Sequence, residues 1–168
     1  MTACIDKNLV REACRALELL KKKNLTLVTA ESCTAGLIAA AMSQAEGASK
    51  TLHGSFVVYT KENKTKALGV SARLLQSEGS VTRKVAEQLL TGALRHSPAD
   101  VALAVTGVLG PEPDEDGNPV GLLFIGCQIK GDTPRIVRKH YRRDSAERLR
   151  RRTVRDALEH LKRNTKKV

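Results

Sequence analysis

The chain has 168 residues and a net charge of +11, and 41 % of its residues are hydrophobic but only 2 % aromatic. This length suits one domain with a sizeable core, and the hydrophobic share is too high for a disordered chain. The scarcity of aromatic rings disfavours nucleic-acid modules that stack bases on aromatic side chains, and no run approaches the ~20 apolar residues of a membrane span.

The first half of the chain alternates helical and strand patterns. Apolar residues recur at helical spacing over residues 5–22, which end in lysines that suit a helix carboxyl terminus. "LTLVTA" and "LHGSFVVYT" (52–60) are typical of strands, and "GLIAAAMS" between them is typical of a helix. A helix over about residues 61–68 and a short helix behind Ser71 are expected next.

The second half continues the alternation. A helical pattern covers residues 82–96, and "VALAVT" (101–106) is typical of a strand buried on both faces. After a long loop, "LLFIGCQI" and "RIVRKHY" predict two strands joined by a turn at 131–134. A last helix is expected from Asp144, with Glu147 three residues on as in a capping box.

This order predicts an α/β fold, with one domain over residues 1–168 and a mixed sheet covered by helices on both faces. The closing hairpin implies one antiparallel strand. Ligands of such sheets bind beyond the carboxyl ends of the strands. Polar segments leave three strand ends, at Glu31–Gly36, Thr60–Lys64 and Thr106–Gly121. They form one pocket if those strands are neighbours.

The positive charge is concentrated at one end of the chain. Residues 135–168 contain fourteen Lys or Arg against four Asp or Glu, a net charge of +10, whereas residues 1–134 carry +1. A solvated basic helix explains this excess, and a surface for a phosphorylated ligand, a partner or RNA is the alternative.

The cysteines and the amino terminus indicate the compartment. Cys4, Cys14, Cys33 and Cys127 are scattered without a C-x-x-C pair, and no apolar signal-peptide core follows the start. We therefore expect free thiols, no zinc site and a cytoplasmic protein.

The segment "TAESCTAG" (29–36) crowds reactive groups before a predicted helix. Ser32 would lie at the helix amino terminus, where free N–H groups favour an oxyanion or a phosphate. A serine becomes a nucleophile only when a base takes its proton. No histidine is well placed in the sequence, which leaves Lys64, with Tyr59 as a relay. Burial or the like charge of Lys61 would lower the pKa of Lys64 as this role requires.

Structural interpretations of the same residues stay open. Ser32 or Thr34 could simply cap the helix. Cys33 could be a buried small apolar residue, or itself a nucleophile with a lowered pKa. The acidic loop does not fit a calcium-binding EF-hand, because its glycine comes two positions early and Ile125 stands where a bidentate Glu is needed.

Five motifs together resemble a known family: "TAESCTAGLIAA", "FVVYTKENKTKALGV", "EGSVTRKVAEQLLTGAL", "ADVALAVTGVLGP" and "NPVGLLFIG". In this order, over about residues 8–162, they resemble the carboxy-terminal domain of the CinA (competence/damage-inducible protein) family. The resemblance implies a three-layer α/β/α domain with a mixed, mostly parallel five-stranded sheet. It also implies a stand-alone form, without the large amino-terminal domain of many relatives.

The resemblance implies an activity as well. Family members include nicotinamide mononucleotide deamidases, which hydrolyse the amide to nicotinate mononucleotide and ammonia in pyridine nucleotide salvage. They use no metal or cofactor and are usually homo-oligomers. By resemblance, Ser32 is the nucleophile, and Lys64 and Tyr59 activate it. The implied partner is a small nucleotide, not a nucleic acid or a membrane. The implied substrate pocket comprises Glu31, Cys33, Thr34, Gly36, Thr106, Gly107 and Gly110.

Several positions depart from the family pattern. Ala35 replaces a glycine, Lys61 stands where asparagine is common, and the later glycines of the Thr-Gly-x-x-Gly-Pro loop are missing. A Gly-Asp-Arg pattern reads Arg143-Asp144-Ser145, without the arginine that could hold a phosphate. The alternative function is therefore a weak or inactive paralogue that binds a nucleotide or a protein through its basic face. The arginines that could replace the missing one are Arg142, Arg143 and Arg148.

Overall fold

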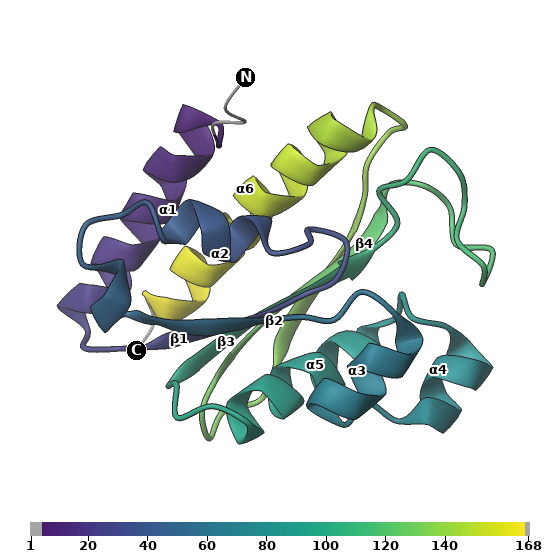
Figure 1. The fold of residues 1–168 in the computed structure, drawn as a ribbon, viewed down its shortest axis with the longest axis horizontal. Helices are drawn as coiled ribbons and strands as arrows, with labels where there is room; N and C mark the ends of the chain where they lie inside the picture. Colours follow the sequence, from purple (N-terminus) through teal and green to yellow (C-terminus); the bar gives the residue numbers. More distant parts are fainter. Residues whose placement is uncertain (1–4, 167–168) are drawn as a thin grey trace.

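The computed structural model describes residues 5–166, which form a five-stranded sheet with helices on both faces (Figure 1). The sheet order is β2-β1-β3-β4-β5. β2, β1 and β3 are parallel, and β4 runs antiparallel to both β3 and β5. The mixed α/β class and the one reversed strand are thus confirmed. The strands are β1 (Leu27–Glu31), β2 (Leu52–Val57), β3 (Val101–Gly107), β4 (Leu122–Ile129) and β5 (Arg135–His140).

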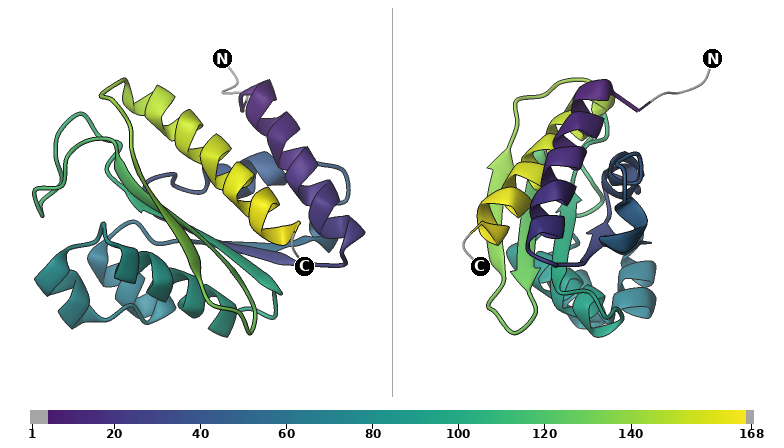
Figure 2. Two further views of the ribbon diagram at one scale, coloured as in Figure 1. Left: turned by 180° about the vertical axis from the view of Figure 1, so that it is seen from behind. Right: turned by 90° about the vertical axis from the view of Figure 1, so that its left-hand side faces the viewer.

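The helices form two layers (Figures 1 and 2). One face of the sheet carries α1 (Lys7–Lys22), α2 (Leu37–Met42) and α6 (Ala146–Thr165). The other face carries α3 (Lys61–Leu68), α4 (Ala72–Glu78) and α5 (Arg83–Arg95). A short 3-10 helix, η1 (Ala48–Lys50), precedes β2 and was not expected from the sequence.

Helices on both sides bury the central strands completely. Every residue of β1 and all of β3 except Gly107 are buried, as the continuous apolar run of residues 101–106 predicts. On the α5 side, Gly92 allows a close approach to α3, because a Cβ atom there would lie 2.2 Å from the carbonyl oxygen of Leu68. Packing against α5 therefore fixes the position of α3, which carries Lys64.

Two helix starts differ from the sequence expectation. α2 begins only at Leu37, because Ala35 (φ 53°) and Gly36 (φ 90°) have left-handed backbones that a helix cannot contain. α6 begins at Ala146 and not at Asp144, since the Ser145 side chain accepts the N–H of Arg148 as the cap.

The connections place three strand ends together. The chain passes from β1 through α2 to β2 on one side, then returns over the opposite face through α3, α4 and α5 to β3 on the other side of β1. In open α/β sheets, ligands bind at such a reversal, beyond the carboxyl ends of the strands. The expectation that the three polar segments leave neighbouring strands is therefore confirmed.

Within residues 5–166, no helix has the length and apolarity needed to cross a bilayer. Cys14, Cys33 and Cys127 are free thiols as expected, and Cys4 lies outside the described residues.

Candidate active site

Ser32 and Lys64 meet at the carboxyl end of β1. The Lys64 ammonium donates to the Ser32 hydroxyl oxygen at 3.0 Å. The backbone N–H of Ser32 donates to the carbonyl oxygen of Val105 in β3 at 3.0 Å, which ties the serine to the reversal point of the sheet. The spacing argument that paired these two side chains therefore describes a real contact.

Lys64 is one of the largest fully buried side chains, with 1 % of its surface exposed. Burial lowers its pKa from 10.5 to about 8, because the charged form loses its hydration. Its second hydrogen bond, 3.1 Å long, goes to the backbone carbonyl of Tyr59. A lysine of this kind releases its proton close to neutral pH and can then act as a base.

Tyr59 contributes its backbone to this contact. Its side chain is 64 % exposed, and together with Val57 it is one of the exposed large hydrophobic residues of the described chain. The contact that joins Tyr59 to the pair is its carbonyl oxygen, which accepts from Lys64. The role of the phenol as a relay stays a prediction from the sequence and the resemblance.

The Glu31 carboxylate lies at the start of α2, where the sequence predicts a binding site for an oxyanion or a phosphate. Its carboxylate is fully buried and accepts the N–H groups of Ile38 (3.1 Å) and Ala39 (2.9 Å) at the start of α2. It also accepts the hydroxyls of Thr29 (3.2 Å) and Thr34 (2.7 Å). The idea of a helix-dipole oxyanion site at α2 is therefore wrong, because a carboxylate of the chain already fills it.

Cys33 follows the structural interpretation. The side chain is buried, and burial raises its pKa to about 12. The nucleophilic form of cysteine is the thiolate, which such a pKa suppresses near neutral pH. The raised pKa of Cys33, together with the contact between Lys64 and Ser32, thus favours Ser32 over its neighbour as the nucleophile.

The β3 end supplies a second wall of the site. The Thr106 hydroxyl donates to the carbonyl of Ser80 at 2.8 Å, which ties β3 to the turn between α4 and α5. Gly107 is required by close packing, since a Cβ there would lie 2.4 Å from that of Leu123. Gly110 has no such restriction, and Gly36 lies beside Val57 of β2. Ser80 lies within one of the family-like motifs but was not among the predicted site residues.

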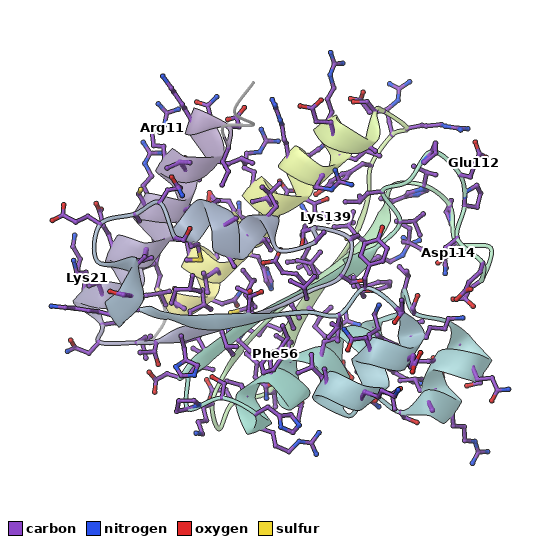
Figure 3. The ribbon with its side chains drawn as sticks, viewed as in Figure 1. Arg11, Lys21, Phe56, Glu112, Asp114 and Lys139 are labelled. Atoms are coloured by element: carbon purple, nitrogen blue, oxygen red, sulfur yellow. The ribbon has the colours of Figure 1, made fainter. Side chains whose placement is uncertain are left out.

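The acidic loop between β3 and β4 (residues 108–121) is held to α3 by ion pairs. Lys61 contacts Asp116 at 2.5 Å and Glu115 at 3.0 Å, and Asp116 also accepts the N–H of Ser80 at 3.1 Å. Figure 3 shows Asp114 and Glu112 on the same projecting loop. These carboxylates raise the pKa of Lys61, its hydrogen bond to Asp116 contributing most. Lys61 is thus paired with carboxylates. Burial, and not the charge of Lys61, is the main cause of the lowered pKa of Lys64.

The arginines proposed as phosphate ligands contact other residues or are exposed. Arg143 donates to the carbonyl of Pro111 at 2.7 Å, Arg148 pairs with Asp144 at 3.6 Å, and Arg142 is exposed. Sequence reasoning missed Arg150, a half-buried residue of α6 whose guanidinium reaches the carbonyl of Cys33 at 3.5 Å. The 3.6-residue period of α6 assigns Arg150 to a helix face, but only the fold shows that this face meets the turn before α2.

No cluster of three His, Cys, Asp or Glu side chains suited to a metal ion occurs within residues 5–166. What the arrangement offers is a hydroxyl held by a buried amine. That is the minimum a serine amidase needs for attack on a carbonyl and for protonation of the leaving nitrogen.

Residues 11–165 match the family model of the CinA C-terminal domain. The chain is 40 % identical over 126 residues to a putative competence-damage inducible protein of Caldicellulosiruptor saccharolyticus, covering 75 % of this chain but only 30 % of that protein. It is also 40 % identical over 128 residues to protein YdeJ of Escherichia coli, covering 76 % of this chain and 74 % of that one. The chain thus spans about a third of some curated relatives and most of another.

Solved structures agree with the sequence matches. The competence/damage inducible protein CihA of Agrobacterium tumefaciens superposes with a TM-score of 0.89 at 34 % identity, over 95 % of this chain and 97 % of that one. A CinA superfamily protein of Escherichia coli gives a TM-score of 0.86 at 34 % identity, over 96 % and 94 %.

Proposed function

Because the chain belongs to the CinA C-terminal domain family, we propose that it is a nicotinamide-nucleotide amidase with Ser32 as its nucleophile. The observation that carries this proposal is the 3.0 Å contact between Ser32 and a buried Lys64 whose pKa is lowered to about 8. The resemblance supplies the substrate, nicotinamide mononucleotide, and the products, nicotinate mononucleotide and ammonia. The proposed setting is cytoplasmic pyridine nucleotide salvage.

The proposed mechanism follows from the two side chains. Neutral Lys64 takes the Ser32 proton while the serine oxygen attacks the amide carbon. The resulting lysine ammonium then gives its proton to the departing nitrogen, so that ammonia leaves and an acyl-serine remains. Lys64 next accepts a proton from the water that attacks the acyl carbon, and it then gives this proton to the Ser32 oxygen as the acid leaves. The cycle ends with Ser32 as a hydroxyl and Lys64 as a neutral amine.

Arg150 is the proposed contact for the substrate phosphate. It is the arginine that touches the catalytic turn, at the Cys33 carbonyl, whereas Arg143 and Arg148 contact Pro111 and Asp144. A guanidinium binds a phosphate by charge and by paired hydrogen bonds. This assignment replaces the three arginines considered from the sequence.

The test is ammonia release from nicotinamide mononucleotide by the purified chain, with EDTA present. Ser32→Ala should lower turnover by a factor on the order of 10³ or more, whereas the matched Cys33→Ala should keep most of it. Arg150→Gln should raise KM for the mononucleotide but leave the riboside, which lacks the phosphate, unaffected. A dead Cys33→Ala beside an active Ser32→Ala would make this a thiol amidase.

A second candidate is a non-catalytic protein of this fold. The exposed basic residues of β5 and α6 favour it, because they form a positively charged surface that a nucleotide or a protein partner could bind. Absence of ammonia release, together with unchanged mononucleotide binding in Ser32→Ala, would select this candidate.

A further inference from the structure

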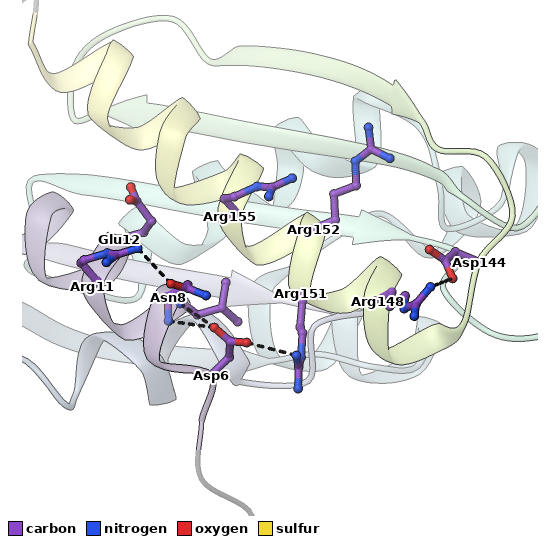
Figure 4. A pocket seen from close by; sticks show the side chains of 10 residues that line it. Asp6, Asn8, Arg11, Glu12, Asp144, Arg148, Arg151, Arg152 and Arg155 are labelled. Carbon is purple, nitrogen blue, oxygen red and sulfur yellow. Dashed lines mark hydrogen bonds and ion pairs between the residues drawn. The ribbon is translucent and has the colours of Figure 1, made fainter.

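A charged groove lies between the amino-terminal half of α1 and the start of α6 (Figure 4). Its volume is about 530 Å³, within the range of small-molecule sites. Leu9 is its one apolar lining residue, and no aromatic ring lines it. The groove shares no residue with the catalytic pair. Five arginines line it: Arg11, Arg148, Arg151, Arg152 and Arg155.

Four of these arginines belong to one side of α6. Arg148, Arg151, Arg152 and Arg155 follow the i, i+3, i+4, i+7 spacing that brings side chains onto one face of a helix. Figure 4 shows them projecting from successive turns, with Asp6 and Arg11 at the α1 side of the groove. Apolar residues of α6 at other positions, such as Val154 and Leu158, are buried against the sheet.

The acidic residues in the groove are already engaged. Asp6 caps α1 by accepting the N–H groups of Asn8 (2.8 Å) and Leu9 (3.3 Å), and it contacts Arg151 at 3.0 Å. Glu12 contacts Lys162 at 2.7 Å and Arg15 at 2.7 Å. The remaining acid, Asp144, contacts Arg148 at 3.6 Å.

Three guanidinium groups make no ion pair shorter than 3.9 Å among residues 5–166. Arg11 bonds only the amide oxygen of Asn8, at 2.9 Å. Arg155 lies 3.9 Å from Asp156, whose carboxylate already accepts the Tyr141 hydroxyl at 2.8 Å. Arg152 stacks over the ring of Tyr141, with its guanidinium carbon 4.4 Å from the ring centroid. This stacking holds the guanidinium in place and lowers the entropy lost on binding.

We infer that this groove binds a small anion that carries two or more adjacent phosphate groups. Three like charges around one cavity repel one another, and a multiply charged anion removes that repulsion while it accepts their hydrogen bonds. Arg11 comes from α1 whereas Arg152 and Arg155 come from α6, so an anion with several phosphate groups offers oxygen atoms to both sides of the groove. An extended nucleic-acid backbone fits less well, because Asp6, Glu12 and Asp144 interrupt the basic lining.

The experiment is calorimetric titration of the full chain with tripolyphosphate, at about physiological salt, where exposed charges are screened beyond ~8 Å. The Arg152→Gln/Arg155→Gln variant should weaken binding by about tenfold or more. The matched control is Arg138→Gln/Arg163→Gln, which removes the same charge from exposed positions outside the groove and should leave the affinity unchanged. Because Arg152 packs on Tyr141, a second variant, Arg11→Gln/Arg155→Gln, keeps that contact and should also weaken binding.

Three results would overturn the inference. They are no binding by the unaltered chain, equal loss in groove and control variants, or tighter binding of a single-stranded oligonucleotide than of tripolyphosphate. The last would make the surface a nucleic-acid face. Every measurement is of binding and none is of turnover. The result therefore does not depend on whether the proposed amidase activity is found.

Discussion

At the scale of single residues, burial of Lys64 lowers its pKa, which suits a base, and also lowers the stability of the fold. Its pKa falls from 10.5 when exposed to about 8 in the fold, so the unfolded chain binds more protons between these values. Stability therefore rises with pH across this window, and below it burial of the charged amine costs on the order of 3 kcal/mol.

Lys64→Met should therefore abolish ammonia release and raise the melting temperature at pH 7 by several degrees. The gain should shrink as the pH approaches 10.5, because both states then hold a neutral lysine in the unaltered chain. Lys66→Met, an exposed lysine of the same helix, is the control and should change little. A lower melting temperature for Lys64→Met at pH 7 would contradict this account.

A second buried residue, Glu31, accepts hydrogen bonds from Thr34, in the turn after β1, and from the first N–H groups of α2. This one carboxylate therefore holds the turn and the helix together. Glu31→Gln places an amide NH₂ against backbone N–H groups and leaves a buried donor without an acceptor. We expect a loss of about 1–3 kcal/mol of stability and a fall in kcat as Ser32 shifts. Urea unfolding and steady-state rates measure both, and Glu46→Gln, an exposed carboxylate just after α2, should affect neither.

At the scale of elements, the loop between β3 and β4 depends on Lys61 of α3. The two unusual features of this chain, the acidic loop and Lys61, contact each other through Asp116 and Glu115. Lys61 lowers the pKa of Lys64 and Glu115 raises it, so the two effects oppose one another at the catalytic amine. The pairing thus positions the loop rather than tuning the base.

Lys61→Asn should accordingly raise KM and speed hydrogen exchange in residues 108–121, while the rate still increases with pH through an apparent pKa near 8. Lys66→Asn also breaks an ion pair on α3, to Glu62, but leaves the loop untouched. It should behave like the unaltered chain. A clear upward shift of the pH profile in Lys61→Asn alone would restore the tuning role expected from the sequence.

At the scale of the whole molecule, β2 forms one edge of the sheet and ends beside the catalytic turn. Val57 and Tyr59, the exposed large hydrophobic residues, lie at this edge. An uncovered edge strand with apolar side chains is a surface for pairing. We propose that the homo-oligomer implied by the resemblance forms here, next to Ser32. Val57→Lys should then lower the mass measured by light scattering, and an unchanged mass would place the interface elsewhere.

The sequence predicted the architecture well because each element has a clear period or cap. α3 and β4 have the expected bounds, and the parallel neighbours of β1 follow from the order of elements. It also predicted the Ser32–Lys64 contact. It could not predict the roles of Glu31 and Arg150, which depend on side-chain directions across the α2 and α6 packing. α2 begins at Leu37, one residue after the predicted start, because Gly36 adopts a positive φ there.

Both members of the catalytic pair come from one continuous stretch, β1 to α3, residues 27–68. The segments around the pair, the acidic loop and α6, come from the distant second half of the chain. Under the proposed function, the two reacting groups therefore come from one stretch of the chain, and the acidic loop and Arg150 come from another. Grafting a relative's loop in place of residues 108–121 should then change the substrate of the proposed amidase while leaving Ser32 and Lys64 in place.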